Sequence, residues 1–359
     1  MIDHDEACGS EDLPAAVKEA PKDRGEEGSV VRVEDVRKYY PCRKGVAERL
    51  LSRGPKWVRA VDGVSFEILQ GETFGLVGES GCGKSTLGRC ILCLEPVTSG
   101  SISVLNRDVG ALKERELRQF RKRIQVVFQN PYSTLPPHRT IGNMLREVVD
   151  FHRIVPQEES KGYCADLLRQ VGLEPALARR RPRALSGGQR QRAAIARALA
   201  TEPQFVVLDE PVTALDVSVQ AQILNLLLDL QEARGLTYLF IAHDLSTIRH
   251  VSDRIGVMYL GKLVELAARE ELFDLPLHPY TRALISSSPH IVDESGDSRV
   301  YLTGEVPSPT NPPSGCRFHT RCPKRFGHCD KEEPSLVDVR PGHAVACFLS
   351  AGTGAPVSP

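Results

Sequence analysis

The sequence lacks a net charge, and it lacks an apolar run long enough to cross a membrane. Its apolar stretches, such as residues 205–208 and 239–242, have the length of a strand, whereas a membrane-spanning helix needs about 20 residues. The balanced charge gives no indication of nucleic acid or an anionic surface as a partner. A signal peptide is also missing, because the first residues, MIDHDEACGSED, are acidic where a basic and then an apolar segment is needed. We therefore expect a cytosolic chain.

Four of the ten cysteines crowd into the last 45 residues, and no two of these four form a C-x2-C pair. Because thiols stay reduced in the cytosol, such a cluster indicates a metal site rather than disulfides. Four thiolates suffice for either a 4Fe–4S cluster or a four-cysteine zinc site, and the missing C-x2-C pairs weigh against common zinc knuckles. The candidate ligands are Cys316, Cys322, Cys329 and Cys347, with His319, His328 and His343 as nearby substitutes.

The order of strand and helix patterns predicts an α/β fold. Apolar residues alternate at period two over residues 30–36 and 64–68, which indicates half-buried strands. Residues 73–77, 205–208 and 237–242 are largely apolar and indicate buried strands. Because helical patterns separate these strands, we expect a mainly parallel sheet.

Helical patterns fill most of the remaining chain up to residue 250. The segment 218–234 is typical, since its apolar residues recur at i, i+3, i+4 and i+7 and a glycine follows it. The proline-rich segment 130–140 can be neither regular helix nor central strand. We expect helices at about residues 85–94, 115–125, 140–180, 186–199 and 218–234, and a hairpin at 254–266.

Composition divides the chain into four parts. Residues 1–29 hold nine acidic residues against three basic ones and predict a disordered acidic leader. Residues 30–270 carry the strands and helices. Residues 271–349 are rich in proline, cysteine and histidine and predict a small second module that builds little core. A bound metal would keep such a module folded. Residues 350–359 are expected to be a flexible tail.

The segment GESGCGKST, residues 78–86, fits the pattern G-x-x-x-x-G-K-[ST]. Its glycines let the backbone wrap closely around a triphosphate, so that successive N–H groups point at phosphate oxygens. Lys84 adds positive charge at the β- and γ-phosphates, and Ser85 can ligate Mg²⁺. Because the loop follows an expected strand and precedes an expected helix, the sequence predicts a nucleotide-binding site.

A second phosphate-binding device follows about 100 residues after Lys84. In LSGGQRQR, residues 185–192, Ser186 stands where a helix N-cap would be, and Gly187 and Gly188 expose the first amides of the helix. The alternative interpretation is an ordinary capped helix start. The separation in sequence is too large for this device to belong to the same loop.

Acidic residues and a histidine end two of the buried strands. Residues 205–208 lead into Asp209, which is placed to hold Mg²⁺, and Glu210, which is placed to polarise the attacking water. His243 ends the next buried strand and would emerge at the same sheet edge. We expect it to contact the γ-phosphate.

Together these motifs resemble those of ABC ATPases over about residues 30–270. The resemblance implies a P-loop NTPase with a RecA-like core, a helical subdomain at about residues 136–188, and the Cys-rich module as a C-terminal extension. Glu210, His243 and Gln129 would serve in catalysis. Ser85, Gln129 and Asp209 would serve at Mg²⁺. The nucleotide-binding residues that it implies are Tyr40 (with Tyr39 as the alternative), Gly78, Ser80, Gly81, Cys82, Gly83, Lys84, Ser85, Thr86, Ser186, Gly187, Gly188, Gln189, Asp209 and Asp216.

The resemblance also implies how such an ATPase works. Two cassettes pair head to tail, so that the Walker A loop of one, residues 78–86, and the signature of the other, residues 185–189, enclose each ATP. ATP closes the pair and hydrolysis opens it, and this motion drives membrane domains that belong to other chains.

The C-terminal half resembles one branch of this family. It looks like the ATPases of oligopeptide and dipeptide importers in three segments, SDRIGVMYLGKLVE (252–265), LHPYTRAL (277–284) and LTGEVPSPTNPPSGCRFHTRCP (302–323). These importers pair two different ATPases, called D and F, and this chain resembles the F member more. In that branch the four tail cysteines hold a 4Fe–4S cluster. The implied partners are a second, non-identical ATPase of the D type, two transmembrane permeases and an extracytoplasmic substrate-binding protein, with this chain at the cytoplasmic face of the membrane. No nucleic-acid partner is expected.

The chain departs from the family after Gln129. It reads QNPYSTLPPHRT where the peptide importers read close to QDP…SLNPRMT, a segment that faces the permease. The permease and the solute therefore stay open, and an importer for another small solute such as a nickel chelate is an alternative. A non-transport ABC ATPase acting on ribosomes or DNA is disfavoured by the single set of motifs and the absence of a long heptad run. A redox sensor is disfavoured by the intact Glu210 and His243.

Overall fold

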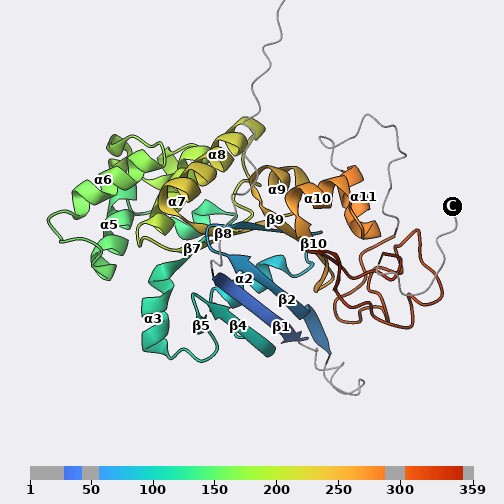
Figure 1. Cartoon of the computed structure of the whole chain (residues 1–359). Helices are drawn as coiled ribbons and strands as arrows, with labels where there is room; N and C mark the ends of the chain where they lie inside the picture. Colours follow the sequence, from blue (N-terminus) through green and yellow to red (C-terminus); the bar gives the residue numbers. More distant parts are fainter. Residues whose placement is uncertain (1–27, 43–55, 288–303, 351–359) are drawn as a thin grey trace, which may run out of the picture.

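The computed structural model describes residues 28–42, 56–287 and 304–350. The predicted leader and tail lie outside the described residues, apart from residues 28, 29 and 350. Strands form two sheets; most helices lie on one side of the larger sheet, while α2 (Lys84–Ile91) packs between the two sheets (Figure 1). This confirms the predicted α/β class.

The smaller sheet has four antiparallel strands in the order β2-β1-β4-β5. The alternation over residues 30–36 buries Val31 and Val33 beneath this sheet, while the residue after each of them, Arg32 or Glu34, is exposed. The sequence predicted two of these strands but not their assembly into a separate sheet. The strands are β1 (Ser29–Pro41), β2 (Trp57–Leu69), β4 (Ser99–Val104) and β5 (Arg107–Asp108).

The larger sheet has eight strands in the order β11-β12-β10-β9-β3-β8-β7-β6. The pairs from β9 to β6 are parallel, and the pairs from β11 to β9 are antiparallel. The expected parallel sheet is therefore only part of it, because the predicted hairpin β9–β10 reverses direction and a C-terminal hairpin continues from it. The strands are β3 (Thr73–Val77), β6 (Ile124–Val127), β7 (Phe205–Asp209), β8 (Thr237–Ala242), β9 (Arg254–Tyr259), β10 (Lys262–Ala268), β11 (Val337–Arg340) and β12 (His343–Val345).

Both faces of the parallel strands are buried, which explains why these strands are apolar throughout. On β8, Tyr238 and Phe240 face a core that is shared with the helices, while Leu239 and Ile241 face a core that is shared with the smaller sheet. The larger sheet is thus the middle layer of the molecule.

The helices begin and end at capping residues that are visible in the local sequence. The Ser186 side chain accepts a hydrogen bond from the Gln189 amide at the start of α7, and Gly235 ends α8 with φ of 62°. None of the described helices combines the length and the apolar character needed to cross a bilayer. The helices are α2 (Lys84–Ile91), α3 (Glu114–Arg123), α4 (Pro131–Thr134), α5 (Ile141–His152), α6 (Ser160–Gln170), α7 (Gly187–Leu199), α8 (Val217–Arg234), α9 (Leu245–Val251), α10 (Arg269–Asp274) and α11 (Pro279–Ser287), with 3-10 turns at Pro175–Arg179 and Pro182–Ala184.

Several expected elements differ in the structure, and the stretch 140–180 is divided into α5, α6 and a 3-10 turn. The helix after the phosphate loop ends at Ile91, because the chain turns at Cys93 with φ of 54°. Helix α3 ends at Arg123, since Ile124 already belongs to strand β6. The segment expected to be irregular contains the single turn α4, whose first residue is Pro131, a position where proline costs the helix no hydrogen bond.

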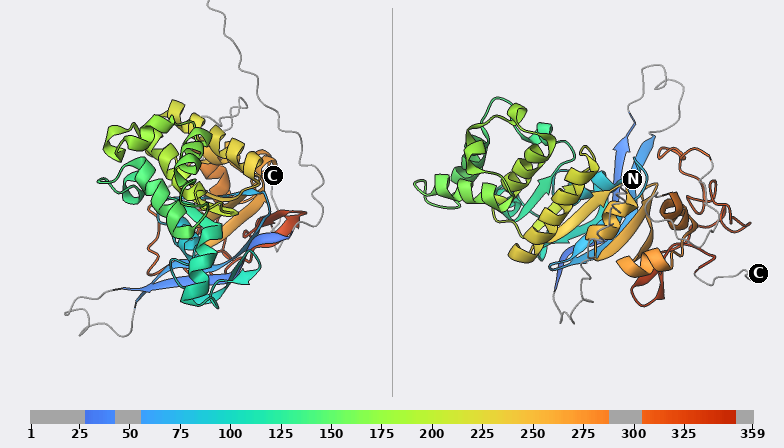
Figure 2. Two further views of the ribbon diagram at one scale, coloured as in Figure 1. Left: turned by 90° about the vertical axis from the view of Figure 1, so that its left-hand side faces the viewer. Right: turned by 90° about the horizontal axis from the view of Figure 1, so that it is seen from above.

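The helices α5 and α6 and the Cys-rich extension lie at opposite ends of the molecule (Figures 1 and 2). The extension builds little core of its own and shares the core of the rest of the molecule. Strand β12 pairs with β10, and Phe318 is 1% exposed and packs edge-on against Tyr259. Tyr280 of α11 packs against both rings.

A buried ion pair joins the extension to the large sheet. His343 and Glu265 are both fully buried, and their Nε2 and Oε1 atoms lie 2.8 Å apart. The other imidazole nitrogen lies 3.3 Å from Glu271. Burial alone lowers the pKa of His343, but the hydrogen bond to Glu265 and the negative charges of Glu265 and Glu271 outweigh this effect and raise the pKa. The two carboxylates thus favour the charged form of the imidazole.

We expect this pair to make stability depend on pH. A raised folded-state pKa stabilises the fold fully below the unfolded value of about 6.5, and this stabilisation is lost as pH rises through the higher folded value. His343→Gln should therefore cost about 3 kcal/mol near pH 6, because it removes the positive charge that faces the buried carboxylate of Glu265. The difference from wild type should shrink at alkaline pH.

Thermal unfolding followed by circular dichroism between about pH 5.5 and 9, a range that brackets the ordinary histidine pKa, measures this difference. The control is His138→Gln at a histidine outside any buried pair. A destabilisation by His343→Gln that stays constant over this range contradicts the prediction.

Candidate functional site

The parallel strands place the predicted site residues at one edge of the sheet. Strands β3, β8, β7 and β6 are neighbours and point the same way, so their carboxyl ends share this edge. The phosphate loop follows β3, His243 follows β8, Asp209 and Glu210 end β7, and Gln129 follows β6. Residues from four distant segments are therefore collected here.

The phosphate loop needs glycine at two close approaches. Gly83 has φ of 110°, and a Cβ atom there would lie 2.1 Å from the Ala60 carbonyl oxygen. At Gly78 a Cβ atom would lie 2.1 Å from the Met258 carbonyl oxygen. The Lys84 Nζ atom spans the loop and donates to the Gly78 carbonyl oxygen at 2.6 Å. The loop is thus folded around its lysine.

Ser85 and Asp209 form the part of the site that suits Mg²⁺. The Ser85 hydroxyl donates to Asp209 Oδ1 at 2.8 Å. Burial raises the pKa of Asp209, and the neighbouring Glu210 charge adds to this rise, while the Ser85 hydrogen bond opposes it. Hydroxyl and carboxylate oxygens are ligands that Mg²⁺ prefers, and a cation would relieve the crowding of two carboxylates. These residues therefore fit the ion.

Three side chains converge on one oxygen of Glu210. Gln129 Nε2 donates to Glu210 Oε2 at 2.9 Å, His243 Nδ1 lies 3.3 Å from it, and the Thr213 hydroxyl donates to it at 3.3 Å. The structure thus brings Gln129 and His243 together with Glu210. It places the Gln129 amide nitrogen on Glu210 rather than on the pair predicted to hold Mg²⁺.

Thr213 was missed by the sequence analysis. Its position three residues after Glu210 is the signal that could have found it, because a tight turn returns such a side chain to the carboxylate. Glu210 itself has φ of 50°, an uncommon conformation for a residue with a side chain. Its backbone N–H donates to the Ile241 carbonyl oxygen at 2.9 Å, which holds the strained residue in place.

The two tyrosines at the end of β1 have different surroundings. The Tyr40 hydroxyl bonds to Glu95 and is within reach of Thr86, next to the phosphate loop. The Lys38 ammonium lies 4.8 Å from the centre of the Tyr40 ring. Tyr39 bonds instead to Asp62. Of the two, Tyr40 is therefore the one beside the predicted nucleotide site.

The predicted signature packs on the segment that carries Asp216. A Cβ atom on Gly187 would lie 3.2 Å from the Leu215 side chain, and one on Gly188 would lie 2.6 Å from Val219. Asp216 stands at the N-cap of α8, and the next residue, Val217, is 79% exposed. The signature and Asp216 thus form one partly exposed surface.

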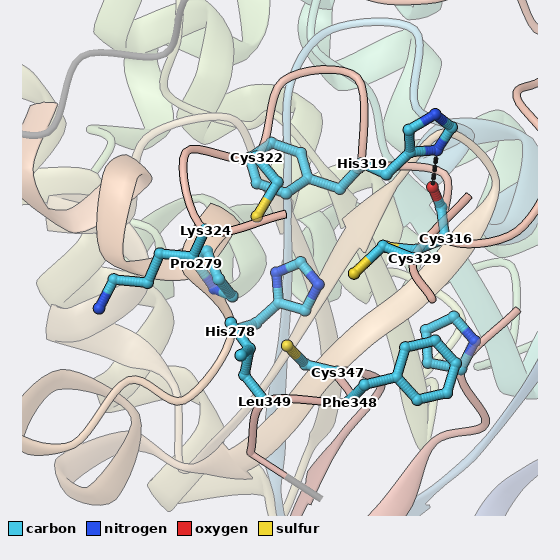
Figure 3. A pocket seen from close by; sticks show the side chains of 12 residues that line it. His278, Pro279, Cys316, His319, Cys322, Lys324, Cys329, Cys347, Phe348 and Leu349 are labelled. Carbon is cyan, nitrogen blue, oxygen red and sulfur yellow. Dashed lines mark hydrogen bonds between the residues drawn. The ribbon is translucent and has the colours of Figure 1, made fainter. Parts of the chain in front are cut away.

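The four tail cysteines line a single pocket, together with His278 and Phe318 (Figure 3). Burial raises the pKa of Cys316 to about 12 and also raises the pKa of Cys322 and Cys347. Within the described residues, no group of three or more histidine, cysteine, aspartate or glutamate side chains is arranged to hold a metal ion. The thiols share a pocket without forming a coordination geometry, so the metal site stays a prediction.

The histidines named as substitute ligands are separated by the fold. His319 lines the pocket, but its Nδ1 atom lies 2.8 Å from the Cys316 carbonyl oxygen. His328 pairs with Glu332 at 3.3 Å. His343 belongs to the buried pair with Glu265.

Comparison with known proteins agrees with this geometry. A family model described as ABC transporter matches residues 61–213. The chain is 49% identical to the oligopeptide transport ATP-binding protein AppF of Bacillus subtilis (strain 168), over 89% of this chain and 97% of the relative. It is 45% identical to the dipeptide transport ATP-binding protein DppF of Escherichia coli (strain K12), over 88% of this chain and 92% of the relative.

The chain belongs to the ABC transporter ATP-binding family. Within this family its C-terminal part matches, over residues 264–329, a model described as oligopeptide/dipeptide transporter, C-terminal region. Among solved structures it is similar to the ATP-binding cassette MJ0796 in a dimeric post-hydrolysis state bound to ADP and Pi, with a TM-score of 0.58 and 31% identity, over 67% of this chain and 98% of that one. The predicted P-loop ABC ATPase fold is confirmed, and the chain is an ATP-binding ATPase.

Glu210→Gln should stop hydrolysis while leaving ATP binding intact. The amide keeps the size of the Glu210 side chain but cannot accept a proton from water, so turnover should fall at least about 100-fold. Phosphate release measures turnover, and size-exclusion chromatography with ATP should show accumulated closed dimers. The matched control is Glu232→Gln at an exposed carboxylate on α8. Unchanged turnover in Glu210→Gln refutes the assignment.

Proposed function

We propose that the chain is one of two non-identical ATPase subunits that power the import of dipeptides or oligopeptides. In this proposal it binds two transmembrane permeases at the cytoplasmic face of the cell membrane, and an extracytoplasmic binding protein delivers the solute. The observation that carries the proposal is the match of residues 264–329 to the oligopeptide/dipeptide C-terminal region. Two similar relatives, AppF and DppF, are named as oligopeptide and dipeptide transport proteins.

The geometry of the site supports a mechanism for the chemical step. Glu210 accepts a proton from the attacking water, and Gln129 and His243 hold its carboxylate in position. Lys84 exchanges its contacts with loop carbonyls for the β- and γ-phosphates. Mg²⁺, held by Ser85 and Asp209, would neutralise charge on these phosphates when bound.

The surface formed by the signature and Asp216 supports pairing with a second cassette. Val217 at this surface is a large apolar residue that one copy leaves uncovered. The amides of Gly187 and Gly188 at the N-terminus of α7 would then meet an ATP held by the partner's phosphate loop. MJ0796, the similar cassette, is described as dimeric.

We propose further that the four-cysteine pocket holds a 4Fe–4S cluster, with Cys316, Cys322, Cys329 and Cys347 as ligands. The donor set is the one such clusters use, and all four thiols line one pocket. Burial raises the pKa values of three of these thiols, and iron would offset this by favouring the thiolates. A zinc ion is the alternative.

Transport is tested by reconstitution. The chain should co-purify with two multi-span permeases and a second ATPase. In proteoliposomes its ATPase activity should rise several-fold with one peptide-loaded binding protein from a panel. Stimulation by a nickel-chelate binding protein instead would show that the transported solute is a nickel chelate rather than a peptide. Recovery of ribosomes or DNA in place of permeases would overturn transport altogether.

The cluster is tested on anaerobically purified protein. It should be brown and contain about four iron atoms per chain, as expected for a cubane cluster. Cys322→Ser should lose most of this iron, whereas Cys90→Ser, at a buried cysteine on α2, should keep it. Colourless protein with stoichiometric zinc contradicts the cluster.

A further inference from the structure

The phosphate loop carries a carboxylate that the predicted mechanism does not use. Glu79 directly follows Gly78, and its side chain forms a two-pronged ion pair with Arg321 of the Cys-rich extension. Arg321 Nη1 lies 2.7 Å from Glu79 Oε2, and Nη2 lies 3.0 Å from Oε1. An arginine that is 242 residues away in sequence is thus bound to the loop that holds ATP.

Arg321 is itself firmly held. Its side chain is 6% exposed, and its guanidinium group lies 5.9 Å from the centre of the Tyr259 ring. The same aromatic cluster reaches the loop from another side, because the Glu79 backbone N–H donates to the Tyr280 hydroxyl at 2.9 Å. Both the backbone and the side chain of Glu79 are therefore fixed by residues outside the loop.

A second arginine of the extension supports the far end of the loop. Arg317 is buried and bonds both to Asp62 on β2 and to the Leu260 carbonyl oxygen. The next residue, Gly261, donates its N–H to the Cys82 carbonyl oxygen at 2.9 Å. The extension thus holds the start of the phosphate loop directly through Arg321, and it supports Cys82 indirectly through the contact of Arg317 with the residue before Gly261.

The charge of Glu79 explains why such a brace is needed. A carboxylate in a loop that must accept a triphosphate repels the ligand, and this repulsion is strong where protein excludes water. The paired guanidinium neutralises the carboxylate, so that it no longer acts as a free charge. Arginine suits this role because its planar fork matches a carboxylate in two hydrogen bonds.

We propose that Arg321 is a positioning residue for ATP binding, which acts by neutralising Glu79 and fixing the first turn of the phosphate loop. This proposal depends on the ATPase activity alone, and neither the transported solute nor a metal in the cysteine pocket enters it. It predicts a defect in nucleotide affinity rather than in the chemical step.

The test compares Arg321→Gln with Arg325→Gln in the full-length chain. Arg325 is exposed in the same extension, so the control removes the same charge. Titration with a fluorescent ATP analogue and Mg²⁺ should give a dissociation constant raised about tenfold by Arg321→Gln, with kcat at saturating ATP within about twofold of wild type. The control should bind as wild type does.

The double variant Glu79→Gln with Arg321→Gln separates charge from structure. Removing both charges should bring the dissociation constant back to within about threefold of wild type, as a coupled pair requires. Arg321→Lys, which keeps the charge, should bind ATP better than Arg321→Gln. Added salt screens the repulsion between Glu79 and the phosphates. The difference in dissociation constant between Arg321→Gln and wild type should therefore become smaller as the salt concentration rises.

Two results overturn the proposal. One is wild-type affinity in Arg321→Gln. The other is a loss of affinity that the double variant does not recover and that accompanies a lowered melting temperature, which marks a structural role only.

Discussion

The parallel alignment of β3, β8, β7 and β6 is the constraint on which the rest of the structure depends. Hydrogen bonds between these strands bring four loops from distant parts of the sequence to one sheet edge. The strands can lie in the middle of the molecule because each is apolar on both faces and is covered on both. A shift of one strand by one residue would turn its buried side chains to the opposite core and move the loop residue at its end.

Glu210 shows how this constraint becomes chemistry. Its backbone takes a conformation that is uncommon for a residue with a side chain, and the neighbouring strand β8 holds it there through Ile241. Gln129 and His243 arrive from the strands on either side of β7. The carboxylate is thus fixed before any nucleotide binds, which lowers the cost of organising the reaction.

The Cys-rich extension is tied to this centre more closely than its place at the end of the chain suggests. It adds β12 to the sheet and a phenylalanine to the core, and its Arg321 binds the phosphate loop directly. Arg321 directly precedes Cys322, which lines the cysteine pocket. The extension therefore contributes to the ATP site as well as to the cysteine pocket, and the sequence motifs of either one alone do not reveal this.

The sequence by itself determined the features that depend on neighbouring residues. These are the buried strands, the glycine loop at residues 78–86, the N-cap at Ser186 and the acidic pair at the end of β7, because period, turn chemistry and capping act over a few positions. Only the tertiary structure decided that the β9–β10 and β11–β12 hairpins continue the parallel sheet, that Thr213 lies beside Glu210, and that Glu79 pairs with Arg321. The last of these contacts joins segments 242 residues apart, and no local pattern records which distant partner a buried charge will meet.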